Sequence, residues 1–503
     1  MAIKLFSAAI IGLDARSIEV EVDFSRGLYS FSIVGLGDKA VEESKERVSS
    51  AVKNSGAKPP QHHNKRITVN LAPADIKKQG PGYDLPIAIG FLLASGQMKK
   101  IETEDKIFIG ELSLDGSVRK VNGILPIAIL AKEKNKILVL PKENQKEAEI
   151  VEGLKILPVS NIKELIRIFE EGQEKYLIEG KGEENVFQDI SFDVDFCYIK
   201  GQEHAKRALE ISAAGGHNVF MSGPPGAGKT LLARALPSIL SSLTKEEILE
   251  LTKIYSVSGL LLPNEPVIKK RPFRAPHHSS SVAAIVGGGS KIKPGEITLA
   301  HRGVLFLDEF PEFRRDVIEA LRQPMEDGIV QVSRAAETFI FPANFTLIAS
   351  ANPCPCGFLN DPQKECNCSP SQIIRYRRKL SGPIMDRIDI KIDVPRIGFE
   401  KLSSKKIAEE SKDIRERVEK AREIQQKRGF VNSDMKIPQI KEYCEIDSES
   451  QDLLKLAIQK LNLSPRAYHK VLKVARTIAD LEGQEKIQKS HIAEAISYQE
   501  KQE

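Results

Sequence analysis

The sequence of 503 residues contains no tryptophan, so binding of a partner has to be followed with a label rather than with the chain's own fluorescence. Long hydrophobic runs are also missing. The longest apolar stretches, residues 85–94 and 124–131, are shorter than the roughly 18–20 residues of a membrane-spanning helix. The start, MAIKLFSAAI, lacks the basic-then-apolar pattern of a secretion signal. We therefore expect a cytoplasmic protein without membrane contact.

Six cysteines in a chain without a secretion signal argue against a disulfide framework. The net charge of +5 is small for this length and does not by itself identify a nucleic-acid binder. With 41% apolar and 28% charged residues, the composition excludes a largely disordered chain. A folded protein of several domains is expected.

The hydrophobic pattern divides the chain into three predicted domains, for a multidomain α/β protein overall. Residues 1–183 alternate short apolar runs with helix-like segments, as in a mixed α/β or α+β domain, and a polar linker is predicted at 179–185. Residues 187–397 alternate apolar strands with helices, which predicts a parallel sheet covered on both faces. Residues 398–503 have helical spacing and predict a helical domain.

A glycine-rich motif in the second domain matches the phosphate-loop pattern in full, follows an apolar strand and opens a helix. Its residues are Gly223, Pro224, Pro225, Gly226, Ala227, Gly228, Lys229 and Thr230. Backbone N–H groups of such a loop surround phosphates, the lysine contacts the β and γ oxygens, and the threonine can ligate Mg²⁺. ATP and Mg²⁺ are therefore the predicted cofactors; the alternative is a fortuitous glycine-rich turn.

Two acidic residues follow the next buried strand pattern, residues 303–307. Strand ends of a parallel sheet meet at one edge, so Asp308 is expected to hold magnesium and Glu309 to activate water. Two acids after a strand can also simply begin a helix. Asn352 follows a third strand, residues 345–350, and its amide could reach the γ-phosphate or merely form a turn before Pro353.

Four cysteines gather in a segment predicted as an insertion at residues 353–370. Cys354, Cys356, Cys366 and Cys368 form two C-x-C pairs that could close a tetrahedral zinc site. The alternative is four free cysteines in a cytosolic loop. Zn²⁺ in such a site would be structural, because four protein ligands leave no open position.

Basic groups near this core are candidate DNA contacts, since cations neutralise phosphates. They are Lys269, Lys270, Arg271, Arg274, His277, His278 and the run Arg375, Arg377, Arg378 and Lys379. A charged run is as often only a solvated face.

From about residue 187 onwards the chain resembles the YifB/ComM family of magnesium-chelatase-like AAA+ ATPases. The resemblance is carried by residues 201–218, 271–281, 294–309, 321–328 and 464–481. It implies that Asn352 is the sensor-1 residue, Arg387 an arginine finger that reaches a neighbour's ATP, and Arg466 the sensor-2 arginine. From the spacing alone, each arginine could equally be a surface residue. An arginine acting in trans implies a ring, most simply a homo-hexamer, with residues 398–503 as the helical lid.

Other parts of the resemblance bear on DNA. Residues 325–334 are similar to the extra β-hairpin of DNA-translocating relatives. Residues 1–183 resemble the Lon-protease-like domain, of ribosomal S5 domain 2 type, that this family carries. Gly82 and Leu125 stand where a Lon protease has its serine and lysine, so peptidase activity is not expected.

These observations predict an ATP-hydrolysing DNA helicase or branch-migration factor of recombination or natural transformation, with recombination proteins as candidate partners. One rival is a chelatase-like ATPase that remodels a protein partner; the Lon-like domain and the cysteine insertion argue against it. Another is a nucleotide-gated scaffold with little turnover, which the intact Glu309 disfavours.

Overall fold

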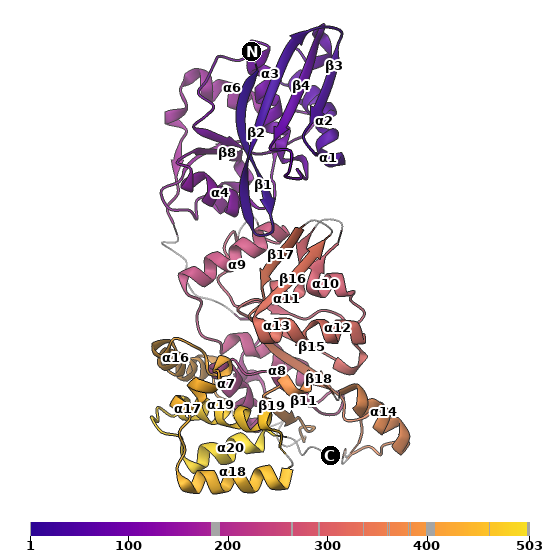
Figure 1. The fold of residues 1–503 in the computed structure, drawn as a ribbon, viewed down its shortest axis with the longest axis vertical. Coiled ribbons are helices and arrows are strands. Elements are labelled where there is room, and N and C mark those ends of the chain that lie inside the picture. The colour runs from indigo at the N-terminus through magenta and orange to yellow at the C-terminus, as the bar shows by residue number, and fades with distance from the viewer. Residues whose placement is uncertain are drawn as a thin grey trace. The chain divides into compact units, whose positions relative to one another are not determined.

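The computed structural model describes residues 2–182, 192–262, 265–289, 292–334, 337–359, 361, 363–380, 382, 384–398, 408–461 and 463–499. They form two compact units (Figure 1). The first contains Met1–Gln188 and Lys245–Ile268, and the second contains Asp189–Thr244 and Lys269–Glu503. The predicted linker at 179–185 lies partly outside the described residues, and Glu179 itself ends a short strand.

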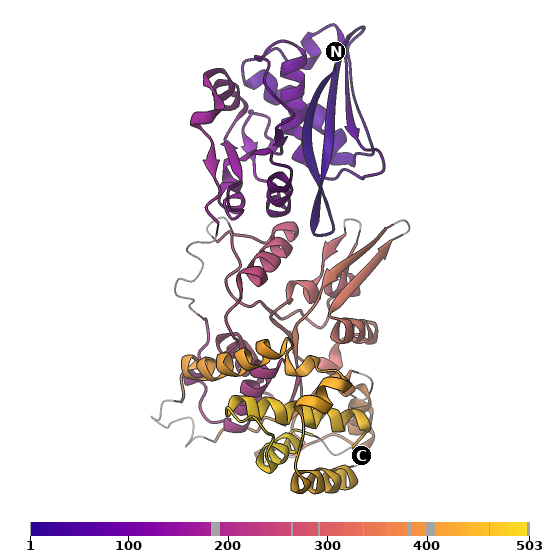
Figure 2. The same cartoon turned by 60° about the vertical axis from the view of Figure 1, so that its left-hand side comes forward.

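The first sheet of the first unit has four strands in the order β1, β2, β4 and β3. They are β1 (Ile3–Ile11), β2 (Asp14–Arg26), β4 (Lys65–Ala72) and β3 (Ser30–Val34). Only β3 is parallel to its neighbour. In β2 every second side chain, Ile18, Val20 and Val22, is buried, as expected when one face of a sheet is covered. Figure 2 shows the twist of the long β1–β2 ribbon.

A helix that is apolar on every side covers this sheet. In α3 (Asp84–Ala94) the ten residues from Asp84 to Leu93 are buried, and the helix packs on β1 and β2. The carboxylate of Asp84 forms two bonds with Arg47 of α2 (Ser44–Asn54), at 2.6 and 3.0 Å, which compensates its burial.

The second sheet of this unit has the strand order β10, β9, β8 and β5. The strands are β10 (Ile178–Glu179), β9 (Lys155–Val159), β8 (Ile137–Pro141) and β5 (Lys106–Phe108), and all but β10 are parallel. The accompanying helices are α4 (Ile124–Glu133) and α6 (Ile162–Glu171). The alternation of short strands and helices predicted for this part of the chain is therefore present.

Helix α9 (Lys245–Ser258) follows the phosphate-loop helix in sequence but belongs to the first unit, where it packs against α4. The Ser256 hydroxyl donates to the buried carboxylate of Glu147 at 2.5 Å, and the same oxygen accepts the Leu125 N–H at 2.9 Å. The sequence placed residues 245–268 in the second domain. A helical pattern shows that a helix has an apolar face, but not which unit covers it.

The second unit is built on a parallel sheet of five strands in the order β12, β15, β18, β11 and β19. They are β12 (Phe273–Arg274), β15 (Val304–Leu307), β18 (Thr346–Ala351), β11 (Val219–Ser222) and β19 (Ile390–Asp393). All residues of β15 and β18 are buried, as expected of central strands covered on both faces. The parallel sheet predicted for this region is confirmed.

The C-terminal part of the second unit is helical, as predicted. Its longer helices are α16 (Ser411–Arg428), α18 (Ser448–Leu461), α19 (Pro465–Leu481) and α20 (Lys489–Ser497). Helices α16 and α19 pack on α7 (Glu203–Gly215) beside the sheet. Val219 of the sheet and Val474 of α19 belong to one apolar core, so the helices extend the core of the sheet. The predicted boundary at 397–398 adjoins residues 399–407, which lie outside the described part.

A β-hairpin precedes β18, formed by β16 (Ile329–Arg334) and β17 (Glu337–Pro342). The sequence placed it at 325–334, which is too early, because residues up to Asp327 belong to α13 (Arg322–Asp327). Gly328 ends that helix in the left-handed conformation, with φ of 65°, the usual role of a glycine after a helix.

Among the helices that the structure describes, none combines the length and apolarity required to cross a lipid bilayer.

Candidate active site

The phosphate loop joins β11 to α8 (Lys229–Ala235). Gly226 and Gly228 have φ of 79° and 91°, a left-handed backbone that side chains disfavour, so glycine is required there to turn the N–H groups inward. The helix begins at Lys229 and adds the positive end of its dipole to the loop.

Lys229 is buried and held by the loop itself. Its ammonium donates to the carbonyls of Gly223 and Pro224, the latter at 3.1 Å, and to the side-chain oxygen of Asn352 at 3.2 Å. Burial lowers the pKa of Lys229, while the carboxylates of Asp308 and Glu309 act in the opposite direction. The ammonium of Lys229 and the amide of Asn352 are therefore hydrogen-bonded to each other beside the loop.

Asp308 follows β15 and reaches the first turn of α8. The Thr230 hydroxyl donates to its Oδ2 at 3.0 Å, and the Ser350 hydroxyl of β18 donates to its Oδ1. A hydroxyl and a carboxylate oxygen at this distance are hard oxygen donors of the kind that Mg²⁺ prefers. Ser350 was not singled out from the sequence. Its position within a buried strand gave no sign that its side chain supports the acid.

Glu309 has a left-handed backbone with φ of 51°, an unfavourable conformation for a residue other than glycine. Its N–H donates to Asp308 Oδ1 at 3.0 Å, and its carboxylate lies 3.6 Å from Nδ1 of His278. The sequence proposed His278 as a DNA contact, whereas the structure places it beside the acid proposed to activate water. The two residues are 31 positions apart, so spacing could not reveal this.

The strand order explains why these groups converge. Strands β15, β18 and β11 are adjacent and parallel, and Asp308, Asn352 and Gly223 directly follow their ends. Three strand ends at one edge of a sheet therefore bring together a carboxylate, an amide and a phosphate-binding loop.

Arg387 and Arg466, the two arginines singled out from the sequence, meet at a third residue. Both guanidinium groups donate to the same carboxylate oxygen of Glu326, Arg466 at a distance of 3.0 Å. These bonds lower the pKa of Glu326, that from Arg466 most strongly. The structure thus joins both arginines to one carboxylate of their own chain.

Comparison with known families covers most of the chain. The family described as "Magnesium chelatase, subunit ChlI" matches residues 195–402, "Magnesium chelatase, subunit ChlI C-terminal" matches 408–499, and "Subunit ChlI of Mg-chelatase" matches 20–144. The chain is 43% identical to the competence protein ComM of Haemophilus influenzae over 98% of its own length and 96% of that protein. It is 41% identical to YifB of Escherichia coli over 97% and 95% of the two chains.

The chain belongs to the YifB/ComM family of magnesium-chelatase-like AAA+ ATPases. Membership of this family implies ATPase activity and suggests ATP and Mg²⁺ as cofactors. The magnesium-chelatase 38 kDa subunit of Cereibacter sphaeroides is more distant, 26% identical over 31% of this chain and 52% of that protein.

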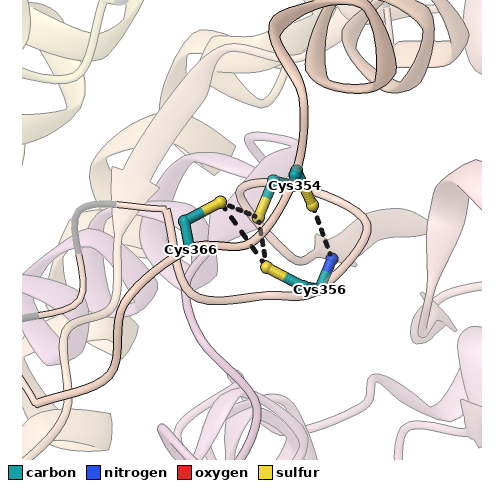
Figure 3. Close-up of side chains that lie close together, drawn as sticks. Cys354, Cys356 and Cys366 are labelled. Atoms are coloured by element: carbon teal, nitrogen blue, oxygen red, sulfur yellow. Dashed lines mark hydrogen bonds between the residues drawn. The ribbon is translucent and has the colours of Figure 1, made fainter.

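In this YifB/ComM chain the four cysteines form one cluster that could hold a metal ion, with sulfur atoms all within 4.8 Å of one another. Figure 3 shows three of them, Cys354, Cys356 and Cys366, with their side chains turned toward one another. Their sulfur atoms are 3.4 to 3.6 Å apart, far beyond the roughly 2.05 Å of a disulfide bond. All four cysteines are therefore free thiols.

Several candidate DNA contacts of this family member have structural partners instead. Arg271 donates to the carbonyls of Ser241 and Arg302 at 2.6 and 2.8 Å, and Arg274 forms two bonds with Glu296 at 2.6 and 2.8 Å. These arginines therefore join segments of the fold. In α14 (Pro370–Leu380) the basic side chains Arg375, Arg377, Arg378 and Lys379 are exposed, and the ammonium of Lys379 lies 3.5 Å from the carboxylate of Glu312.

Proposed function

We propose that this chain is the subunit of an ATP-hydrolysing ring motor that acts on DNA as a helicase or branch-migration factor. The observation that carries the ATPase part is the meeting of Lys229, Asp308 and Asn352 at one edge of the parallel sheet. Positioned charges and hydrogen-bond donors of this kind provide most of the catalysis in phosphoryl transfer.

Each residue has a proposed role in hydrolysis. Residues 223–230 hold the phosphates with their N–H groups, and the Lys229 ammonium neutralises the β and γ oxygens. Thr230 and Asp308 would hold Mg²⁺, which spreads charge away from the reacting phosphate when bound. Glu309 orients and deprotonates the attacking water, and Asn352 hydrogen-bonds that water or the γ-phosphate.

Arg387 is proposed to be an arginine finger that completes the site of a neighbouring subunit, and Arg466 is proposed to be the sensor-2 arginine. Because both bind Glu326 of their own chain, they form a pair of positive charges that can be presented together. A site that needs arginines from the next subunit is active only in a closed assembly, most simply a hexameric ring.

The DNA part of the proposal rests on two features. Helix α14 exposes four basic side chains within five residues, an arrangement suited to phosphates of a nucleic-acid strand. The β16–β17 hairpin is the second feature, because this region is similar to the extra β-hairpin of DNA-translocating relatives. The proposal also draws on the 43% identity to a protein of Haemophilus influenzae named as a competence protein, ComM.

The first unit is proposed to be a Lon-protease-like domain without peptidase activity, which binds DNA or helps to form the ring. A side chain at Gly82 would meet Ile109 at 2.9 Å, and Leu125 is fully buried. Neither position supplies a nucleophile or a base.

The alternative function is remodelling of a protein partner, as the similarity to the magnesium-chelatase 38 kDa subunit suggests. The DNA-motor function and the protein-remodelling function are distinguished by the ATPase rate measured with and without single-stranded or four-way-junction DNA. We expect DNA to stimulate wild-type protein strongly, Glu309→Gln to bind ATP without hydrolysis, and Arg375→Ala/Arg377→Ala/Arg378→Ala to lose stimulation but keep basal activity. A Glu309-dependent rate that DNA leaves unchanged would favour the protein-remodelling function.

A further inference from the structure

The four-cysteine cluster has the dimensions of an assembled metal site. A tetrahedral zinc ion with Zn–S bonds of about 2.3 Å separates its sulfur ligands by about 3.8 Å. The sulfur atoms of Cys354, Cys356 and Cys366 are separated here by 3.4 Å (354 to 356), 3.6 Å (354 to 366) and 3.5 Å (356 to 366). The N–H of Cys356 also donates to Cys368 Sγ at 3.4 Å, the kind of bond that orients a thiolate ligand.

The segment carrying these cysteines has little else to hold it. The described residues between 352 and 369 contain no helix or strand, so no backbone ladder fixes them. Three of the four cysteines are partly exposed and only Cys354 is fully buried. A loop with so small a core is typically ordered by a metal or a disulfide, and these sulfur distances exclude the disulfide.

The same loop touches the ATP site. Gly357, one residue after Cys356, has φ of 84°, and a Cβ added to it would lie 2.7 Å from Pro225 of the phosphate loop and 3.6 Å from Asn352. Its N–H donates to the carbonyl of Cys354 at 3.0 Å. The cysteine loop therefore packs directly on the phosphate loop and on the sensor amide that Lys229 binds.

We propose that the four thiolates bind one Zn²⁺ ion and that this ion holds Asn352 and the phosphate loop in register for ATP hydrolysis. Zinc is proposed because four sulfur donors around one ion would leave no open coordination position, which is the pattern of a structural zinc site. Asn352 is only two residues before Cys354, so loss of the ion frees the backbone that carries the sensor amide. This second half of the inference rests on the proposed role of Asn352 in hydrolysis.

The metal is tested separately from activity. Elemental analysis of the full-length protein should find about one zinc per chain, and cobalt-grown protein should show the intense visible bands of tetrahedral thiolate ligation. Cys366→Ser should lose the metal, while Cys197→Ser, a cysteine outside the cluster, should keep it. Zinc-free wild-type protein, iron in place of zinc, or zinc retained in Cys366→Ser would overturn the metal site.

The coupling to hydrolysis is tested with a variant that keeps all four cysteines. Gly357→Ala should retain zinc and lower kcat by roughly tenfold, because the new Cβ displaces the loop from Pro225. Gly429→Ala is the matched control, since Gly429 has nearly the same φ, 85°, and nothing within 4 Å of an added Cβ. If Gly357→Ala turns over ATP as fast as Gly429→Ala, the loop does not act on the site and the coupling is rejected.

Reconstitution covers the case in which Cys366→Ser does not fold. Wild-type protein stripped of zinc should regain its kcat when stoichiometric Zn²⁺ is returned, with Mg²⁺ held constant. Equal rates before and after zinc addition, with zinc binding verified, would overturn the coupling while leaving the proposed ATPase function intact.

Discussion

Glu326 lies where two arginines from distant parts of the second unit meet. Arg387 precedes β19 and Arg466 is the second residue of α19, and each donates to the same oxygen of this carboxylate. Without the negative charge, two guanidinium groups at this distance would repel each other. Glu326 is therefore expected to position the pair without touching ATP.

Glu326→Gln should lower kcat for ATP hydrolysis by roughly tenfold, because a charged hydrogen bond that aligns both arginines is worth about 1.5–3 kcal/mol. ATP affinity should change little, since the phosphate loop is unaltered. The measurement is kcat and nucleotide Kd, determined separately. Glu319→Gln, which removes a partly exposed carboxylate paired only with the nearby Arg322 among the bonds described, should leave both constants unchanged. An unaltered kcat in Glu326→Gln would show that the pair needs no counter-ion.

At the candidate ATP site, the sequence predicted the residues that directly follow strands, but not the contacts between residues that are distant in the sequence. The phosphate loop, Asp308 and Glu309 were predictable because each directly follows a strand, and parallel strand ends share an edge. The contact of His278 with Glu309 could not be predicted, and neither could the binding of two arginines to Glu326. Both depend on how segments that are distant in the sequence pack together.

For helices and strands, too, the local pattern predicted the element but not its packing partner. Apolar runs gave the strands of the parallel sheet, because burial on both faces leaves a continuous signature. The hairpin predicted at 325–334 begins too early, because Met325, Glu326 and Asp327 belong to a short helix that ends at Gly328. The partner of α9 could not be predicted, since its contact with Glu147 spans 109 residues.

The attachment of α9 can be tested at Ser256. Its hydroxyl donates to Glu147, a carboxyl whose pKa is raised by burial, so Ser256→Ala leaves a buried oxygen short of one donor. This should cost about 1–3 kcal/mol of local stability, seen as faster hydrogen exchange in α9 and α4. Ser258→Ala, whose hydroxyl donates only within its own helix among the bonds described, should cost less than about 0.5 kcal/mol. Equal exchange in both variants would mean that apolar packing alone holds α9.

For the whole molecule, the decisive question is whether a site is shared between subunits. Lys229→Ala removes the phosphate lysine but leaves the arginines, and Arg387→Ala does the reverse. If Arg387 acts in trans, mixing the two inactive proteins should restore ATPase activity, because about a quarter of randomly mixed interfaces would join an intact loop to an intact arginine.

The mixing experiment needs a control that cannot complement. Lys229→Ala mixed with a Lys229→Ala/Arg387→Ala double variant should stay inactive at every ratio. Analytical ultracentrifugation of the same mixtures should show that rings form. Mixed rings without recovered activity would place Arg387 in its own subunit's site and remove the main reason to expect a ring.

The position of helix α9 limits where the chain can be cut into separate units and how its two units can have been joined in evolution. The chain passes between the two units three times, because Lys245–Ile268 returns to the first unit before the second is complete. A gene fusion that joins two finished domains end to end creates a single junction. Here, excision at residue 183 or 187 would leave a fragment with the face of α4 uncovered and another with α9 lacking its partner. The two units are therefore inherited together, and neither can be exchanged for another module by one crossover.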